Sequence, residues 1–366
     1  MSSRLGKVSV MSAVFLLISL FGSFALAADA PGKTEVRFSV YFPLHYPVWK
    51  EGLGPWEEMV EKESKGQFTF KNFPNAVLNT TSQGFRATMT DIVDITHGYP
   101  FTQAASFNLS HVNDLPFVLL NQQGGALVME TLYPKYLKAE YEKMGVYLAF
   151  WVTTSPYNII TKKPIRTLAD LKGLKIRSGG GYASDVLEAL GAVPVTVAGP
   201  ELYTAFQSGM VDGLLHMDAA VASYKLQEIG KYILQININR LGVPYCLNKK
   251  FFDALSPEKK RFFYNKLRQA SQMASVAYDI DDIQAKKVLK EQNVEFTYLS
   301  EEDTKKVHKA MESVWKKFID VNTAKGLPAK EFIEEIRVLS EKYKNLTPEQ
   351  AMETVTKTPL QGIINF

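Results

Sequence analysis

Residues 168–197 read LADLKGLKIRSGGGYASDVLEALGAVPVTV, and this stretch changes between strand and helix patterns. Leu174–Arg177 and Val193–Val197 have the pattern of short strands. Tyr182–Leu190 lies between them with helical spacing, and Gly191 provides its stop. A strand, a helix and a strand in this order form a β-α-β unit, which is typical of parallel or mixed sheets. The stretch therefore predicts an α/β fold.

The same alternation continues on both sides of this stretch. Thr34–Phe42 alternates apolar and polar residues as a strand does, and Val146–Thr153 is an apolar strand pattern. The last third of the chain differs, because residues 256–258 (Ser-Pro-Glu) start a helical pattern that continues to about Gln292. We expect two α/β regions followed by a mostly helical C-terminal third.

The composition is that of a soluble globular protein, because apolar residues make up 46% and charged residues 22% of the 366 residues. This excludes a mainly disordered chain, a collagen-like chain and a membrane protein with many spans. Basic residues number 42 against 38 acidic ones, without a basic run, so we expect no nucleic-acid partner. The single cysteine, Cys246, cannot form an intramolecular disulfide and is expected to be buried.

Residues 1–27 have the three parts of a secretory signal peptide. Arg4 and Lys7 supply the positive charge at the start. Val8–Phe24 is a nearly continuous apolar stretch, and Ala25–Ala27 forms an A-x-A cleavage site. A transmembrane anchor is the competing interpretation, but the small residues at the end of the stretch favour cleavage. We therefore predict export across the inner membrane to the periplasm.

No short pattern in the chain indicates catalysis or metal binding. Neither G-x-S-x-G nor H-E-x-x-H occurs in the sequence. The five histidines show no metal-ligand spacing, although a site assembled from distant residues stays open as an alternative. The sequence predicts a protein that is not an enzyme and that needs no cofactor or metal.

Arg177 is the strongest candidate for a ligand contact. It ends a predicted strand and is followed by Ser178–Gly181, which leads into a helix. In open α/β sheets, ligands lie beyond the carboxyl ends of strands, and arginine binds a carboxylate or sulfonate through two parallel hydrogen bonds. The helix start also favours an anion, whereas the glycines lack the spacing of a nucleotide-binding loop. A surface arginine or an inter-domain salt bridge is the alternative.

Aromatic residues and a histidine gather near the predicted strand ends, which favours an aromatic-lined pocket. The group comprises Phe42, His45, Tyr46, Tyr99, Phe101, Trp151, Tyr157 and Tyr182. Packing in the core is the alternative for each of them, since aromatic residues make up 12% of the chain.

Five segments form an ordered set along the chain. They are Asp114–Phe117, Leu168–Arg177, Gly191–Val195, Glu201–Gly213 and Leu247–Ser256. Each segment is degenerate, but the ordered set spans most of the chain after the signal peptide. It resembles the extracytoplasmic solute-binding proteins of TRAP transporters, the DctP-like family.

The resemblance implies a two-lobed α/β fold of the periplasmic-binding-protein type, with mixed sheets, an interlobe ligand cleft and a long bracing helix. Residues 28–150 would form lobe I, with a returning segment near 240–260. Residues 151–239 would form lobe II. Residues 256–366 would supply the bracing helix and C-terminal helices that pack on both lobes.

The resemblance also implies a function. Such a protein closes on a small organic-acid anion and delivers it to the small and large TRAP membrane subunits, which take it up along an ion gradient. It performs no chemistry itself, and we expect a monomer. Arg177 would form a salt bridge with the ligand carboxylate.

Departures from the family pattern narrow the expected ligand. No second arginine lies near Tyr157, an acidic position near Tyr99 is replaced, and His216 stands where an asparagine often contacts the ligand. We therefore expect a monoanionic organic acid, with a ring as one option. Asp218 is a candidate contact for a ligand amine. The predicted ligand-binding set is Arg177, His216, Asn248, Tyr157, Tyr99, Trp151, His45 and Asp218, with no catalytic and no metal-binding residue.

Two alternatives stay open from the sequence. The same fold also suits a receptor of an ABC-type transporter or a ligand-sensing partner of a membrane kinase. An exported α/β enzyme is the third hypothesis, which the absence of a nucleophile or metal pattern disfavours.

Overall fold

The structure is a computed structural model that describes residues 32–366, so the predicted signal peptide lies outside the described residues. Its strands form one hydrogen-bonded path in the order β2-β1-β3-β9-β4-β7-β5-β6, and β8 and β10 branch from β4. The strands are β1 (Thr34–Ser39), β2 (Phe68–Phe73), β3 (Ile95–His97), β4 (Val146–Thr161), β5 (Lys175–Ser178), β6 (Val193–Thr196), β7 (Gly213–Met217), β8 (Tyr232–Leu234), β9 (Arg240–Asn248) and β10 (Glu295–Thr297). Parallel and antiparallel pairs both occur, so the sheets are mixed as expected.

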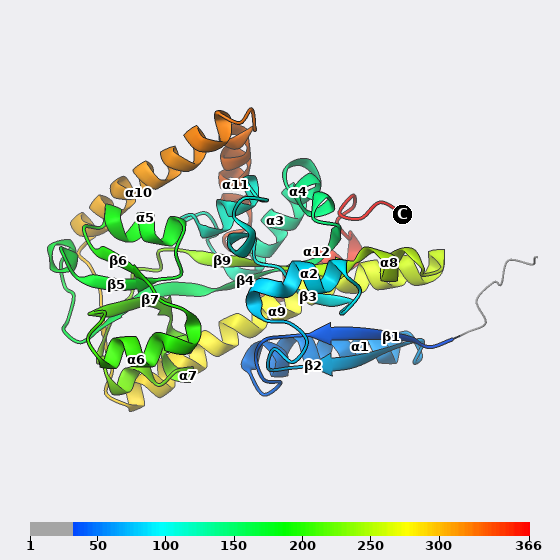
Figure 1. The fold of residues 1–366 in the computed structure, drawn as a ribbon, viewed down its shortest axis with the longest axis horizontal. Helices are drawn as coiled ribbons and strands as arrows, with labels where there is room; N and C mark the ends of the chain where they lie inside the picture. The colour runs from blue at the N-terminus through cyan, green and yellow to red at the C-terminus, as the bar shows by residue number, and fades with distance from the viewer. Residues whose placement is uncertain (1–31) are drawn as a thin grey trace, which may run out of the picture.

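The long strand β4 joins the two halves of the molecule (Figure 1). Its first part pairs with β9, and its last part pairs with β7 and β8. The register shifts between Thr153 and Pro156, where the side chain of Thr154 accepts a hydrogen bond from the backbone of Leu241 at 3.0 Å. The sequence predicted a strand that ends at Thr153, but the side-chain oxygen of Thr154 takes a ladder position and the strand continues through the bulge to Thr161.

The molecule therefore has two lobes that share a strand. One lobe contains β1, β2, β3 and β9, and the other contains β5, β6, β7, β8 and β10. The predicted division at residues 150/151 falls inside β4, which belongs to both, so the lobe boundaries stay a prediction. The β-α-β order predicted from residues 168–197 is confirmed, because β5 and β6 are parallel and α5 (Tyr182–Ala189) lies between them in the chain.

Helix α9 (Pro257–Glu291) runs along both lobes (Figure 1). Its 35 residues span roughly 52 Å at ~1.5 Å per residue. Ser256 caps its start by accepting a hydrogen bond from the backbone N–H of Lys259 at 3.3 Å, and Pro257 occupies the first turn. It packs against η1 (Trp49–Leu53) in one lobe and against α7 (Asp218–Ser223) in the other.

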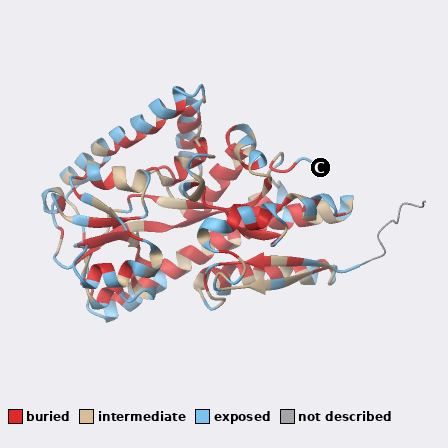
Figure 2. Ribbon diagram, viewed as in Figure 1, coloured by how far each residue is buried: buried red, intermediate tan, exposed pale blue. Residues whose placement is uncertain are grey.

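The remaining helices cover the outside of the sheets (Figure 2). They are α1 (Gly54–Glu63), α2 (Gly84–Met89), α3 (Gln122–Tyr136), α4 (Lys138–Lys143), α6 (Leu202–Gln207), α8 (Lys249–Asp253), α10 (Glu301–Thr323), α11 (Ala329–Tyr343) and α12 (Pro348–Lys357). In the helical C-terminal third, α10 packs on α5 of one lobe, whereas α11 and α12 pack on α3 of the other. Among residues 32–366, no helix has both the length and the apolar character needed to cross a bilayer.

Candidate ligand-binding site

Arg177 is a buried cation without an acidic partner. It lies near the carboxyl end of β5, between β6 and β7, and only 9% of it is exposed. Its Nε donates to the carbonyl oxygen of Val197 at 2.9 Å, and its other guanidinium nitrogens make no hydrogen bond within the described chain. No carboxylate of residues 32–366 lies within 4.0 Å of it, and burial lowers its pKa. A buried guanidinium in this state favours an anion from outside the chain.

The loop after β5 holds Arg177 at the start of α5. The Ser178 side chain accepts a hydrogen bond from the N–H of Gly180 at 3.1 Å and bonds the Ser184 hydroxyl at 2.8 Å. Gly180 and Gly181 have φ of 94° and 60°, which residues with a side chain rarely adopt. Gly180 and Gly181 are therefore required by the turn.

His216 and Tyr157 flank Arg177 from β7 and β4. Their rings stack with centroids 5.5 Å apart and 12° between planes. The backbone N–H of Met217 donates to His216 Nδ1 at 2.9 Å, so we assign the imidazole proton to Nε2. Burial and the charge of Arg177 lower the pKa of His216 to about 3. His216 is therefore neutral at ordinary pH and offers an N–H donor.

Three residues at the end of β3 and β1 form an aromatic wall in the other lobe. Tyr41 meets His97 edge-on at 4.8 Å, and its hydroxyl lies 3.3 Å from that of Tyr99. His97 is fully buried, and burial lowers its pKa to about 3. Tyr99 continues the wall to Phe101, whose ring is 5.1 Å away. The predicted site residue Tyr99 thus belongs to an aromatic group, together with Tyr41, which sequence reasoning missed.

Phenols from both lobes and from α9 are electrostatic neighbours of one another. Burial raises the pKa of Tyr46, and its electrostatic neighbours raise it further; they are Asp281, Tyr41, Tyr224 and Tyr157. Tyr224, which follows α7, is 43% exposed, and its ring lies 6.2 Å from that of His216. Tyr278 of α9 has the same neighbours in Tyr41, Tyr46 and Tyr157, so burial and these phenols raise its pKa. Tyr278 gave no sequence signal, because it lies in the middle of a helix.

The structure does not bring Trp151 and His45 into this group. Trp151 is fully buried and pairs with Pro244 in the middle of the β4–β9 ladder, with its ring 6.3 Å from that of Tyr141. It is a core residue of one lobe, because both faces of β4 are covered there. His45 is exposed in the turn before η1 and makes no contact with Arg177, His216 or the aromatic wall.

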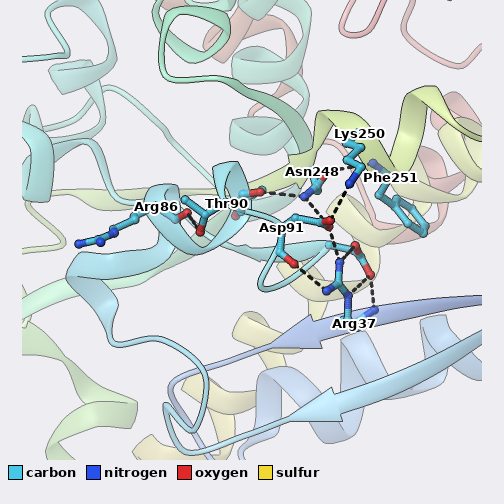
Figure 3. Close-up of polar contacts among 9 residues, drawn as sticks. Arg37, Arg86, Thr90, Asp91, Asn248, Lys250 and Phe251 are labelled. Carbon is cyan, nitrogen blue, oxygen red and sulfur yellow. Dashed lines mark hydrogen bonds and ion pairs between the residues drawn. The ribbon is translucent and has the colours of Figure 1, made fainter.

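Asn248 ends β9, beside the end of β4 that is far from Tyr157. It pairs with Val146, about eleven residues or roughly 36 Å along the strand from Tyr157. Figure 3 shows its amide within a polar cluster: it donates to the backbone of Thr88 at 2.9 Å and to Asp91 at 3.2 Å. Its oxygen caps α8 by accepting from the N–H of Phe251 at 2.8 Å. These contacts make Asn248 a helix cap and exclude it from the Arg177 group.

The same cluster ties β1 to the loop before β3. Arg37 binds Asp94 and Asp91 through its guanidinium at 2.7 Å, and Lys250 lies 3.4 Å from Asp91 (Figure 3). Arg37 is thus fully paired, unlike Arg177.

Asp218 has no free carboxylate oxygen for a ligand amine. It begins α7 and is fully buried. Its oxygens accept from Asn158 Nδ2 at 3.0 Å and from Gln235 Nε2 at 2.8 Å, and Lys286 Nζ lies 3.7 Å away. The predicted amine contact is therefore not supported by this geometry.

Within residues 32–366, no three or more His, Cys, Asp or Glu side chains lie close enough to hold a metal ion. Cys246 is buried as expected, and burial raises the pKa of its thiol. Two surface cavities, of 680 and 450 Å³, lie elsewhere on the molecule and include none of the residues around Arg177.

We expect the stability of the protein to fall as the pH drops from about 6.5 towards 3, because of His97 and His216. Their pKa is lowered in the folded state, so the unfolded chain binds more protons in this window and the free energy of unfolding rises with pH. His216→Gln removes one of the two contributions. The gap in melting temperature between about pH 7.5 and about pH 4.5 should shrink by several degrees in a thermal unfolding assay.

The matched control is His45→Gln, because His45 lies in an exposed turn. We expect it to keep the wild-type pH profile. A His216→Gln variant with that same profile would contradict a half-buried, neutral imidazole.

A family profile and a curated relative both match the DctP family of solute-binding proteins. The profile of the bacterial extracellular solute-binding proteins of family 7 (DctP) matches residues 41–321. The C4-dicarboxylate-binding periplasmic protein DctP of Rhodobacter capsulatus is 29% identical over 66% of this chain and 74% of its own length.

Solved structures of TRAP solute-binding proteins share the fold. A protein from Bordetella bronchiseptica with bound (R)- and (S)-mandelate has a TM-score of 0.74 at 27% identity, covering 84% of this chain and 99% of that one. A protein from Rhodoferax ferrireducens in complex with copurified benzoate has a TM-score of 0.78 at 21% identity, with 85% and 99% covered.

Proposed function

The chain belongs to family 7 of the bacterial extracellular solute-binding proteins, the TRAP solute-binding proteins, and we propose that it captures a small organic-acid anion between its two lobes. One observation carries the choice of an anion. Arg177 is buried at the carboxyl end of β5 with its guanidinium free of any carboxylate in residues 32–366. A ligand carboxylate supplies the missing negative charge and accepts two parallel N–H bonds.

We propose that His216 adds a third donor. Arg177 is near enough to His216 for its charge to lower the pKa of the imidazole, and a neutral donor brings no second positive charge to the site. A site with one cation and one neutral donor suits a monoanion better than a dianion, since a second carboxylate would stay uncompensated.

The aromatic surroundings favour an acid with a ring. Tyr157 and Tyr224 on one side and Tyr41 and Tyr99 on the other present ring faces and hydroxyl groups around the site. Ring pairs add about 0.5–1.5 kcal/mol each beyond the apolar area they bury. The mandelate and benzoate found in relatives support this class.

We further propose the physiological setting. The mature receptor would act in the periplasm as a monomer and hand its ligand to the small and large membrane subunits of a TRAP transporter, without altering it chemically. The lobes would be residues 28–150 and 151–239, with the returning segment near 240–260 completing the first. Closure would occur around β4, since this strand belongs to both lobes.

The test is a ligand screen with the chain from residue 28 onward. The protein is unfolded and refolded first to remove any copurified ligand. It is then titrated calorimetrically with benzoate, mandelate, phenylacetate, succinate, pyruvate and glucuronate. We expect micromolar or tighter binding of at least one ring monoacid, and weaker binding of succinate and glucuronate. Binding of succinate or glucuronate alone would overturn the ring-acid class, and failure of every acid to bind would overturn the proposed receptor function.

A further inference from the structure

Asp281 in α9 is a buried carboxylate that nothing in the described chain compensates. It is only 6% exposed, and its Oδ2 is buried without a hydrogen-bond partner. No lysine, arginine or histidine of residues 32–366 lies within 4.0 Å of it. Leaving a charge buried and unpaired is strongly unfavourable, so such a group is rare unless function requires it.

The other acidic residues nearby all have partners. Asp282, the next residue, binds Lys286 at 2.6 Å. Asp279 accepts a hydrogen bond from Gln123, and Asp218 accepts two. Asp282 also has one buried oxygen without a hydrogen bond, but of these four carboxylates only Asp281 has neither an ion pair nor a side-chain hydrogen bond among residues 32–366.

That position lies between two contacts of α9 with the strands that carry Tyr157 and His216. Asp281 lies one helical turn beyond Tyr278, where α9 passes from η1 in one lobe to α7 in the other. Tyr278 is tied to β4, because its carbonyl oxygen accepts a hydrogen bond from the Ser155 hydroxyl at 2.7 Å, two residues before Tyr157. Further along the helix, Lys286 lies 3.7 Å from Asp218, two residues after His216. Asp281 thus lies in the part of α9 between these two contacts, close to the residues that flank Arg177.

We propose that Asp281 is a second ligand anchor, which accepts a hydrogen bond from a hydroxyl or ammonium group carried by the bound acid. This inference rests on the proposed function, because it assumes that Arg177 holds the carboxylate. A ligand whose carboxylate binds Arg177 and whose opposite side carries a hydrogen-bond donor for Asp281 gives both of these charged groups a partner. The substrate class is then a ring monoacid with a hydrogen-bond donor, and a bare ring acid is a poorer ligand.

The test compares matched acids on three variants and the refolded wild-type protein. The probes are phenylacetate against 3- and 4-hydroxyphenylacetate, and benzoate against 3- and 4-(aminomethyl)benzoate. We expect at least one donor-bearing acid to bind roughly 10-fold tighter than its parent in the wild-type protein. Asp281→Leu should abolish this ratio and leave the Kd of the parent acid within about 3-fold.

The other two variants distinguish a hydroxyl donor from an ammonium donor on the ligand and test whether the effect is specific to Asp281. Asp281→Asn keeps an acceptor oxygen without charge, so it should spare a hydroxyl ligand and weaken an ammonium ligand. Asp282→Asn removes the same charge one residue away, where the carboxylate is paired, and should leave every ratio unchanged. A melting temperature for each variant shows that it is folded.

Two results would overturn the proposal. One is a wild-type protein that prefers no donor-bearing acid over its parent. The other is an Asp281→Leu variant that keeps the wild-type ratio. If the parent acids still bind in an Arg177-dependent manner, the proposed receptor function stands and only the second anchor fails.

Discussion

Arg177→Met is expected to weaken binding of a ring monoacid by roughly 100-fold or more, because it removes the buried guanidinium that we propose binds the ligand carboxylate. Methionine keeps the length and the apolar stem of arginine but offers no N–H donor. Arg177→Lys should lie between the two, since an ammonium group keeps the charge but cannot donate two parallel hydrogen bonds to one carboxylate. Isothermal titration of the refolded variants with the tightest acid of the screen measures both effects.

The fold should survive this change. Arg177 has no ion pair in the described chain and a single hydrogen bond, to Val197, so the variant loses little stability and keeps its melting temperature within a few degrees. The control is Arg166→Met, because Arg166 is exposed and pairs with Glu295 on the surface at 2.6 Å. It should bind as the wild type does. An Arg177→Met variant with wild-type affinity would refute the assignment of the anion site.

Arg268→Met is expected to destabilise the protein by about 3–5 kcal/mol, because it leaves the buried carboxylate of Glu130 without its ion-pair partner. Arg268 of α9 and Glu130 of α3 are both fully buried, with Nη1 and an oxygen of Glu130 2.7 Å apart. The same carboxylate oxygen accepts the backbone N–H of Trp151 at 2.9 Å, and Arg268 donates to the carbonyl of Ala149. The pair therefore joins α3, β4 and α9 inside one lobe.

The pH dependence of this loss follows from Glu130. Burial raises its pKa to about 7, although Arg268 opposes the shift. Between its ordinary pKa of 4.5 and about 7 the folded protein binds more protons than the unfolded chain, so this group contributes less stability as the pH rises. Without Arg268 the pKa rises further, and the loss should be greater at about pH 8 than at about pH 5.

Urea unfolding followed by circular dichroism measures this difference. Lys135→Met is the control, because Lys135 forms exposed ion pairs with Glu331 and Glu335, and we expect little change in stability. The double variant Glu130→Met with Arg268→Met should recover much of the loss, since it leaves no charge unpaired. A single Arg268→Met variant as stable as the Lys135→Met control would show that the buried pair does not brace the lobe.

Two residues of β4 show why the sequence alone could not identify all of the site residues. Trp151 and Tyr157 belong to one strand, and both looked like wall residues. The pairing of β4 with β9 buries Trp151 in the core. Further along β4, the pairing with β7 leaves Tyr157 half-buried beside His216. Alternation along a strand cannot separate these cases when both of its faces are covered.

The polar predictions differ for a similar reason. Asn248 precedes a short helix, and its capping bond to Phe251 is a local pattern that the sequence already contains. Its distance from Arg177 follows only from the antiparallel pairing of β4 and β9. Asp218 lies two residues after His216, but its carboxylate oxygens accept hydrogen bonds from Asn158 and Gln235, which belong to other parts of the chain. The partners of a polar side chain are thus decided by contacts that no local spacing encodes.

The sequence by itself determined the β-α-β order, the helical last third and the place of Arg177 at the end of a strand. These features depend on the spacing of neighbouring residues, because helices and strands repeat every few positions. Only the tertiary structure decided that Tyr41, Tyr46 and Tyr278 are neighbours and that Asp281 has a buried oxygen without a partner among residues 32–366. Helix α9 carries polar residues on several faces, and the side of the helix that each lobe covers is set by how η1 and α7 pack against it.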